Sequence, residues 1–138
     1  MVVDASVIVS RLVPHDVHHA ASRAWLSRHI AAGGLVIAPA LLLPEVSGAV
    51  ARRTGSPRLA RRAVEAVLRL PGLRLVPVDD VLARTAAGLA ARLRLRGADA
   101  VYIAAAATLR LPFMTWDAEQ RERAARIIEV SAPDEAGS

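Results

Sequence analysis

Several residue types are missing or scarce in this chain, and each absence excludes a class of chemistry. There is no cysteine, so the chain forms no disulfide and offers neither a thiol nucleophile nor a thiolate metal ligand. There is no lysine either: all 18 basic residues are arginine, which excludes every mechanism that requires a lysine amine. Aromatic residues make up 3% of the 138 residues and hydrophobic residues 54%, so Leu, Val, Ile and Ala must build the core.

Long apolar runs and a leader sequence are also missing. No apolar run reaches the roughly 20 residues that a membrane-spanning helix needs. The first nine residues, MVVDASVIV, lack the basic leader and the small-residue cleavage site of a signal peptide. We therefore expect a cytoplasmic protein without a membrane segment, with the length of one domain. The polar residues 132–138 predict a short tail after a domain over residues 1–131.

The net charge of +5 favours polyanionic partners, because arginine binds phosphate through two parallel hydrogen bonds. A GC-rich genome would explain the absence of lysine equally well. The composition therefore permits a nucleic-acid partner without identifying one.

Short apolar runs alternate with longer segments of helical periodicity along the chain. The strands that we expect are residues 1–5, 35–38, 73–78, 112–116 and 127–130. The helices that we expect are residues 7–13, 18–32, a segment after Pro39 to about Arg53 that Gly55 ends, 57–70 capped by Ser56, a segment from Asp79 or Asp80 to about Arg96, 98–110, and 117–125. Strands separated by helices pair in parallel through right-handed crossovers, so the pattern predicts an α/β sandwich with helices on both faces.

Four acidic residues stand where a strand ends or a helix begins. Asp4 ends the first expected strand and Asp117 directly follows the fourth, while Glu45 and Asp99 lie in the first turns of helices. The carboxyl ends of parallel strands share one edge of the sheet, and ligands bind there. We therefore expect all four carboxylates to project toward that edge.

Helix capping is the alternative explanation for the same four acids. Acidic residues at helix starts accept hydrogen bonds from free N–H groups, and in an α/β fold these caps all lie on this edge. The pattern from Asp117 to Gln120 fits a capping box, so for Asp117 we favour the cap. Taken singly, each of the other three is as compatible with a cap as with a ligand.

The surroundings of two of the acids favour a metal. Asp4 interrupts the apolar run MVV-D-ASVIV, and Asp99 opens the apolar helix AVYIAAAA. A buried carboxylate costs several kcal/mol unless it is paired or bound to a metal. The nearest arginines, Arg11 and Arg96, are separated from them by a helix turn or by a glycine. A hard divalent cation is then the simplest neutraliser, and oxygen ligands favour Mg²⁺ or Mn²⁺.

Around these acids the sequence resembles the PIN-domain family, in particular the VapC-type toxins of bacterial toxin–antitoxin pairs. The resemblance rests on residues 2–6 (VVDAS), 41–46 (LLLPEV), 97–104 (GADAVYIA) and 115–117 (TWD), in the family's order and spacing. It covers about residues 1–130. Ala98 departs from the family, which often has a bulkier or aromatic residue there, and this weakens any inference about the substrate sequence.

The resemblance implies a PIN-like three-layer sandwich with a five-stranded parallel sheet and a carboxylate pocket for one or two Mg²⁺ ions. Asp4 and Asp99 match the principal metal ligands of the family. Glu45 matches a ligand that binds directly or through water, and Asp117 a ligand of a second ion. In addition, two hydroxyl residues match positions that hold the cluster or its waters, namely Ser6 and Thr115.

The resemblance further implies endonucleolytic cleavage of RNA and inhibition by a cognate antitoxin. Such a site uses a metal-activated water and needs no side-chain nucleophile. We also expect a homodimer or a tight antitoxin complex, because residues 98–109 are too apolar to leave one side in water. The alternative that stays open is a non-catalytic PIN-like scaffold that binds RNA or a protein.

Other motifs carry weaker indications. The HDVHH segment, residues 15–19, could bind a transition metal, but we expect it in an exposed turn. Residues 92–96 (RLRLR) are more typical of a solvated helix end than of an RNA clamp, and Trp25 and Trp116 are expected in the core or an interface. Phosphoacceptor receivers and HAD-type phosphatases need a lysine, which the chain lacks.

Overall fold

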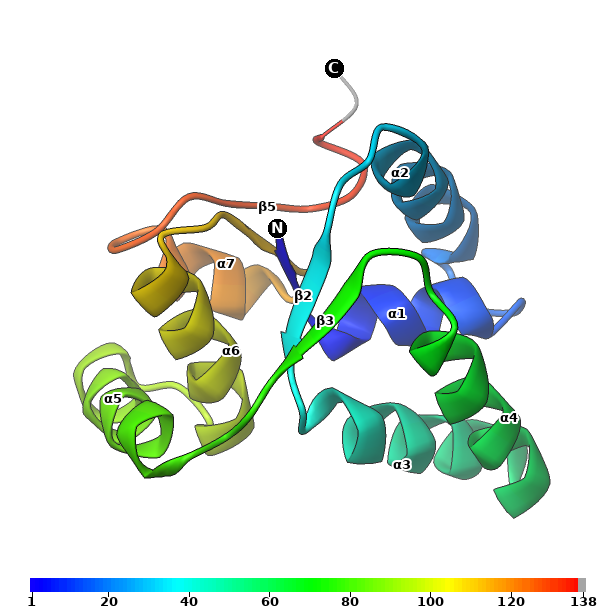
Figure 1. Ribbon diagram of the computed structural model, residues 1–138, viewed down its shortest axis with the longest axis horizontal. Coiled ribbons are helices and arrows are strands. Elements are labelled where there is room, and N and C mark those ends of the chain that lie inside the picture. Colours follow the sequence, from blue (N-terminus) through cyan, green and yellow to red (C-terminus); the bar gives the residue numbers. More distant parts are fainter. Residues whose placement is uncertain (137–138) are drawn as a thin grey trace.

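Five parallel strands form the central sheet within residues 1–136, the part of the chain that the computed structural model describes (Figure 1). They are β1 (Val2–Val3), β2 (Val36–Pro39), β3 (Leu73–Val76), β4 (Phe113–Met114) and β5 (Val130–Ser131). Their order across the sheet is β3-β2-β1-β4-β5. Every neighbouring pair is parallel, as the alternation of strands and helices predicted.

Seven helices cover the two faces of this sheet in the described part of the chain. α1 (Ala5–Leu12), α2 (His19–Ala31), α3 (Leu42–Thr54) and α4 (Pro57–Leu68) lie on one side, and α5 (Asp80–Leu93), α6 (Gly97–Leu109) and α7 (Ala118–Ala124) lie on the other (Figure 1). This confirms the α/β three-layer sandwich. Between residues 1 and 136, no helix combines the length and the apolar character that crossing a membrane requires.

The strand order reverses next to β1, and this reversal creates the crevice where the site lies. After β1 the chain adds β2 and β3 on one side of it, and then crosses to add β4 and β5 on the other. β1 and β4 pair with Val2 opposite Phe113 and Val3 opposite Met114. Helices that leave two adjacent parallel strands in opposite directions leave an open crevice at the strands' carboxyl ends.

Local signals set most helix boundaries where the sequence predicted them. The Ser56 hydroxyl accepts a hydrogen bond of 3.1 Å from the Leu59 N–H at the start of α4. The Asp79 carboxylate likewise accepts one of 2.8 Å from the Leu82 N–H at the start of α5. Gly55 ends α3 with a φ of 68°, in the left-handed region that glycine enters without steric cost.

Several predicted boundaries are wrong. The first strand ends at Val3 and α1 begins at Ala5, where we expected a strand over residues 1–5 and a helix over 7–13. α5 ends at Leu93 and does not continue to Arg96, because Arg94 adopts a left-handed conformation with φ 55°. The fifth strand is Val130–Ser131 and not residues 127–130, because the N–H groups of Ile127 and Ile128 both donate to the Ala124 carbonyl in the turn after α7.

The apolar helix α6 is buried inside the chain itself. It packs against α5 and lies over β1 and β2, and its buried residues are Ala100 and Tyr102 to Ala106. An apolar helix covered on several sides by its own chain needs no partner to shield it. The apolar character of this helix therefore no longer supports a homodimer, and the homodimer stays a prediction.

The predicted tail, residues 132–138, begins with packed residues. Ala132 and Pro133 are buried, and residues 134–136 are exposed. Its last two residues, 137 and 138, lie outside the described part of the chain.

Two glycines should respond in opposite directions to alanine. Gly72 has a φ of 76°, and a Cβ there would stand 3.0 Å from the Gly34 carbonyl oxygen, whereas a Cβ on Gly88 within α5 would meet nothing. We expect Gly72→Ala to lower the free energy of unfolding by about 1–2 kcal/mol, because of left-handed strain. We expect Gly88→Ala to raise it by roughly 0.5–1 kcal/mol through helix propensity. Urea unfolding of both variants measures this, and equal shifts of the same sign would contradict it.

Candidate functional site

The Asp4 carboxylate lies at the carboxyl ends of β1 and β4. The residue is 7% exposed, and it follows directly after β1 as the N-cap of α1. The Thr115 hydroxyl, just after β4, donates a hydrogen bond of 3.0 Å to Asp4 Oδ2, and the Ser6 N–H donates one of 3.2 Å. No arginine forms an ion pair with Asp4 in the described part of the chain.

Hydroxyl groups tie the two strand ends together around Asp4. Ser6 Oγ lies 3.4 Å from Thr115 Oγ1 and accepts a hydrogen bond of 3.1 Å from the Trp116 N–H. Thr115 Oγ1 also accepts a bond of 3.1 Å from the Asp117 N–H. Each hydroxyl thus links β1 to β4, which holds the Asp4 carboxylate in one orientation.

Asp117 caps a helix, as the capping interpretation predicted. Its Oδ1 accepts a hydrogen bond of 3.0 Å from the Gln120 N–H at the start of α7, and the residue is exposed. A capping carboxylate needs one oxygen for the N–H group, so its other oxygen can serve a cation. Asp4 is also a cap, since it accepts from the Ser6 N–H.

Glu45 and Tyr102 bring two buried polar groups to the site that interact with each other. Glu45 Oε1 and the Tyr102 hydroxyl lie within interaction range of one another, but neither atom forms a hydrogen bond of good geometry within residues 1–136. Tyr102 lies one turn along α6 from Asp99 and is fully buried. Burial raises the pKa of Glu45, the Tyr102 hydroxyl lowers it, and the Asp4 and Asp99 charges raise it again.

Asp99 is affected by the charges of two other acids. Its pKa is raised from an ordinary value of 3.8 to about 6, first by burial and then by the charges of Asp4 and Asp117. Arg96 and Gln120 oppose this rise in pKa. Burial also raises the pKa of Asp4, although hydrogen bonds from Ser6 and Thr115 lower it in part. Carboxylates that repel each other in the folded chain lower its free energy of unfolding.

The acids line two cavities and do not share one. Asp99 and Asp117 line a cavity of about 240 Å³, and Glu45 and Ser6 line another of about 450 Å³. The buried Asp4 lines neither of them, yet its charge acts on both Glu45 and Asp99. All four predicted residues thus come from the edge where they were expected, with Glu45 set apart from Asp99 and Asp117.

A hard divalent cation fits the donor chemistry of this site. The donors are carboxylate and hydroxyl oxygens. Burial and the neighbouring negative charges raise the pKa of Asp99 and Glu45, and a cation would offset both effects. Within the described residues, no group of three or more acidic, His or Cys side chains is already close enough to hold an ion. Binding a cation would therefore require these side chains to draw together.

The structure adds residues to which the sequence assigned no role. Tyr102 and the Gln120 side-chain amide place buried polar atoms at the site, where Tyr102 interacts with Glu45 and Gln120 with Asp99. Arg121 Nη1 donates to the carbonyls of Thr115 and Trp116 and so braces the loop after β4. The three-residue spacings from Asp99 to Tyr102 and from Asp117 to Gln120 put each pair on one helix face, and this signal could have found them.

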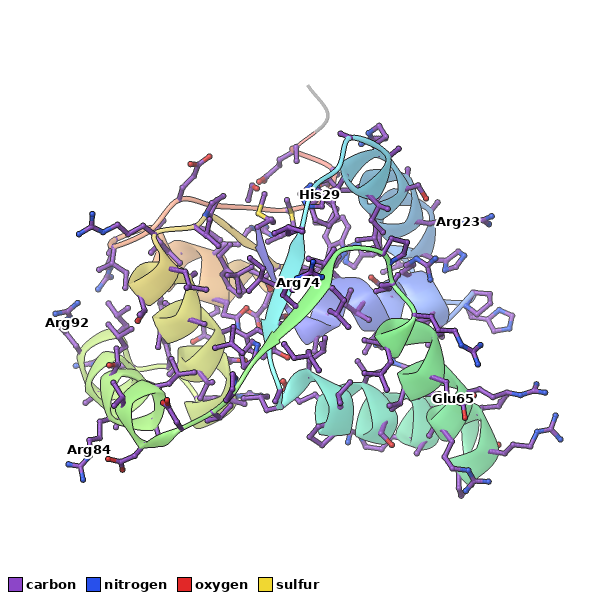
Figure 2. The ribbon with its side chains drawn as sticks, viewed as in Figure 1. Arg23, His29, Glu65, Arg74, Arg84 and Arg92 are labelled. Carbon is purple, nitrogen blue, oxygen red and sulfur yellow. The ribbon has the colours of Figure 1, made fainter. Side chains whose placement is uncertain are left out.

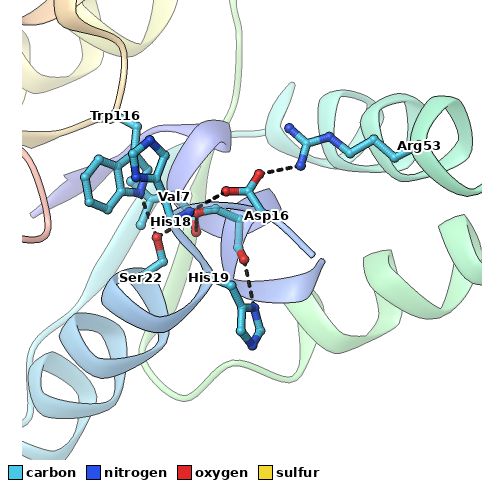
Figure 3. Close-up of polar contacts among 8 residues, drawn as sticks. Val7, Asp16, His18, His19, Ser22, Arg53 and Trp116 are labelled. Atoms are coloured by element: carbon cyan, nitrogen blue, oxygen red, sulfur yellow. Dashed lines mark hydrogen bonds and ion pairs between the residues drawn. The ribbon is translucent and has the colours of Figure 1, made fainter. Parts of the chain in front are cut away.

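The HDVHH segment forms the expected turn, with His15 and Val17 exposed, but its other residues are half-buried. Asp16 forms an ion pair with Arg53, and His19 Nδ1 lies 3.0 Å from the Ser10 carbonyl oxygen (Figure 3). The His18 ring stacks on Trp116 with centroids 3.7 Å apart (Figure 3). Of the three histidines only His15 is exposed, and the segment packs α1 and α2 against the loop after β4.

Trp25 and Trp116 differ in their surroundings. Trp25 is buried in the core, as expected. Trp116 is half-buried, and its Nε1 donates a hydrogen bond of 2.7 Å to Ser22 Oγ. Because Trp116 lies between Thr115 and Asp117, its stacking and this bond fix the position of the site loop.

Several solved structures share this fold at low sequence identity. VapC20 of Mycobacterium tuberculosis, described as a sarcin–ricin loop cleaving toxin, is 24% identical with a TM-score of 0.74 over 94% of this chain and 97% of that one. VapBC2 of Rickettsia felis, bound to a DNA fragment from its promoter, is 12% identical with a TM-score of 0.71 over 95% and 96%. FitAcB of Neisseria gonorrhoeae is 22% identical with a TM-score of 0.71 over 96% of both chains.

A sequence comparison with curated proteins finds no match. The family model described as the PIN domain matches residues 1–126 of this sequence. That range contains the acidic and hydroxyl residues that follow β1 and β4 or begin α3 and α6. They are Asp4, Ser6, Glu45, Asp99 and Thr115. The chain belongs to the PIN domain family.

Proposed function

We propose that this PIN domain is a Mg²⁺-dependent endoribonuclease and the toxin of a toxin–antitoxin pair. The observation that carries the proposal is the group of acids at the reversal of the strand order, where burial, and then the charges of Asp4 and Asp117, raise the pKa of Asp99 to about 6. Folding tolerates such repulsion where a cation or a reaction requires the charges, and groups with strongly shifted pKa values mark functional sites.

In this proposal Asp4 and Asp99 hold the principal ion, Glu45 supports it directly or through water, and Asp117 serves a second ion. When bound, Mg²⁺ or Mn²⁺ supplies activation of a water and stabilisation of the charge that develops on the phosphate. The chain offers no cysteine or lysine to take over these roles.

The remaining residues position the acids and hold protons. Thr115 and Ser6 keep the Asp4 carboxylate in place through hydrogen bonds of 3.0 and 3.2 Å. Burial and the charge of Glu45 raise the pKa of Tyr102 far above its usual range, so its hydroxyl stays protonated and can donate a hydrogen bond to Glu45, to a bound anion or to water. The Gln120 amide offers both a donor and an acceptor on the other side of Asp99.

RNA and an antitoxin are the proposed partners. The arginine-rich chain with its net charge of +5 suits a polyanionic substrate. The description of VapC20 as a loop-cleaving toxin supports RNA cleavage by analogy of fold. An apolar groove of about 610 Å³, between the end of α1 and helices α3 and α4, offers an antitoxin segment a surface lined by Leu12, Val13, Val50 and Leu59.

The first test is RNA cleavage by acid variants. Asp99 and Asp80 both lie in the first turn of a helix, but Asp80 is exposed and pairs with Arg84. We expect Asp4→Asn and Asp99→Asn to lower the Mg²⁺-dependent cleavage rate at least 100-fold, because each removes a metal ligand. Asp80→Asn should cleave like the wild type. Mapping of RNA ends with Mg²⁺ and with EDTA gives the rates and should show 5′-phosphate and 3′-hydroxyl products.

RNA binding and cleavage by the wild-type protein distinguish the enzyme from the non-catalytic scaffold. RNA binding without cleavage in any divalent ion would establish the non-catalytic scaffold and reject the proposal. Equal cleavage rates in wild type and Asp99→Asn would show that the carboxylates only cap helices.

The second test follows from the pKa of Asp99 in the protein without metal. Its folded pKa of about 6 lies above the ordinary value of 3.8, so the folded state binds the proton more tightly than the unfolded state. The stability that protonated Asp99 contributes to the folded state is therefore fully present below pH 4 and is lost as pH rises through 6. We expect Asp99→Asn to be more stable than wild type above pH 6 by about 1 kcal/mol, after allowance for solvent screening of a half-buried group.

Thermal melting at pH 4 to 8 in EDTA measures this difference. Asp80→Asn controls for the loss of a negative charge from a first turn, and it should show no such pH dependence. Mg²⁺ should raise the melting temperature of the wild type more than that of Asp99→Asn. A difference between the two proteins that does not change with pH would contradict the crowded-site interpretation.

A further inference from the structure

The cavity that holds Asp99 and Asp117 continues into a second one lined by arginines. The first, of about 240 Å³, is also lined by Arg94, Arg96 and Arg123. The second, of about 470 Å³, is lined by Arg92, Arg94, Arg123 and Arg126, together with Glu119 and Glu122. Arg94, Glu119 and Arg123 line both cavities, so the two adjoin beside the end of α5 and α7, and we call them together the channel.

Not every arginine of this channel is available to a ligand. Arg123 forms an ion pair with Glu119 and also donates to the Arg94 carbonyl, so it fastens α7 to the turn after α5. The remaining four form no ion pair within residues 1–136, and we call them the arginine border: Arg92, Arg94, Arg96 and Arg126. Glu122 is the one acid of the second cavity that Arg123 does not neutralise. The arginine border therefore has an excess of positive charge.

The early end of α5 creates this arrangement. In the sequence, residues 92–96 looked like a solvated helix end, and Arg92 does extend outward from α5 (Figure 2). Because the helix stops at Leu93, however, Arg94 and Arg96 stand in the turn before α6. Both line the cavity that holds Asp99, and the half-buried Leu95 between them packs against the core.

Arg94 occupies a backbone conformation that favours glycine. Its φ is 55°, and Arg110, which ends α6 in the same way, has a φ of 54°. The strain is equal at both helix ends, so strain alone does not mark a binding site. The two arginines differ in their surroundings: Arg94 lines the channel beside Asp99, whereas Arg110 lines a separate cavity with Pro112 and Ile127. Arg110 is therefore a control for Arg94, with the same backbone conformation in different surroundings.

We propose that the arginine border binds the phosphates of the RNA strand on one side of the bond to be cleaved. This inference rests on the proposed function. Asp99, Asp117 and Glu119 would repel a polyanion at the mouth of the channel, so a strand that enters needs cations directly beside them. Arginine guanidinium groups hold phosphate oxygens through paired hydrogen bonds, and a single strand can follow a groove of this kind without sequence preference.

Arg94→Gly and Arg110→Gly test the proposal. Both should melt at a higher temperature than wild type, because glycine adopts the left-handed conformation without strain. Only Arg94→Gly should bind a labelled single-stranded RNA oligonucleotide more weakly, by about tenfold in fluorescence anisotropy in EDTA, which prevents cleavage. The slope of log affinity on log salt should fall by about 0.7, the value for one phosphate contact of a single strand.

A second variant removes another arginine of the border. Arg96 is the N-cap of α6 without a side-chain cap, so Arg96→Ser should strengthen the helix start and still weaken RNA binding. Stability and affinity that move in opposite directions distinguish a ligand-binding arginine from a structural one.

Each outcome decides for or against the arginine border. Equal RNA affinity of Arg94→Gly and Arg110→Gly, with cleavage by the wild type intact, would overturn this inference and leave the proposed function standing. A wild-type protein that neither binds nor cuts RNA would overturn both. Loss of binding to polyglutamate, with RNA binding unchanged, would assign the surface to an acidic protein segment and overturn the inference as well.

Discussion

The hydrogen bond from the Thr115 hydroxyl to the Asp4 carboxylate joins residues 111 positions apart, and the rest of the site depends on it. It forms because β1 and β4 lie side by side in parallel, which brings the residues after each strand to the same edge. Ser6 and the N–H groups of Trp116 and Asp117 extend this junction. The starts of α3 and α6 then only have to reach the same edge to bring Glu45 and Asp99 within electrostatic range.

Charge is distributed over this edge in two zones. The carboxylates gather at this edge, where burial raises the pKa of Asp4, Glu45 and Asp99, and neighbouring negative charges raise it further for Glu45 and Asp99. Arginines gather next to them, along the end of α5 and along α7. The acids repel a polyanion that approaches them. The neighbouring arginines would offset this repulsion, so the two zones could act on the same ligand. A metal ion and a phosphate backbone would satisfy both.

Capping a helix does not prevent the same side chain from binding a metal ion. Asp4 and Asp117 both accept hydrogen bonds from helix N–H groups, as the structural interpretation of the sequence required. Asp4 is nevertheless buried at the strand reversal, beside Glu45 and Asp99, neither of which caps a helix through its side chain. A carboxylate has two oxygens, and the geometry of a helix start engages one of them. The capping pattern is therefore no argument against a site.

The sequence by itself determined the alternation of parallel strands and helices, the caps at Ser56 and Asp79, and the edge to which the four acids project. These features follow from local periodicity and from short-range hydrogen bonds. Only the tertiary structure decided that α6 is covered by its own chain, that Tyr102 and Gln120 join the site, and that Glu45 lines a separate cavity. It also decided that α5 stops at Leu93, which places Arg94 and Arg96 beside Asp99. Burial and electrostatic neighbours depend on contacts between segments far apart in the chain, and a local sequence pattern does not contain them.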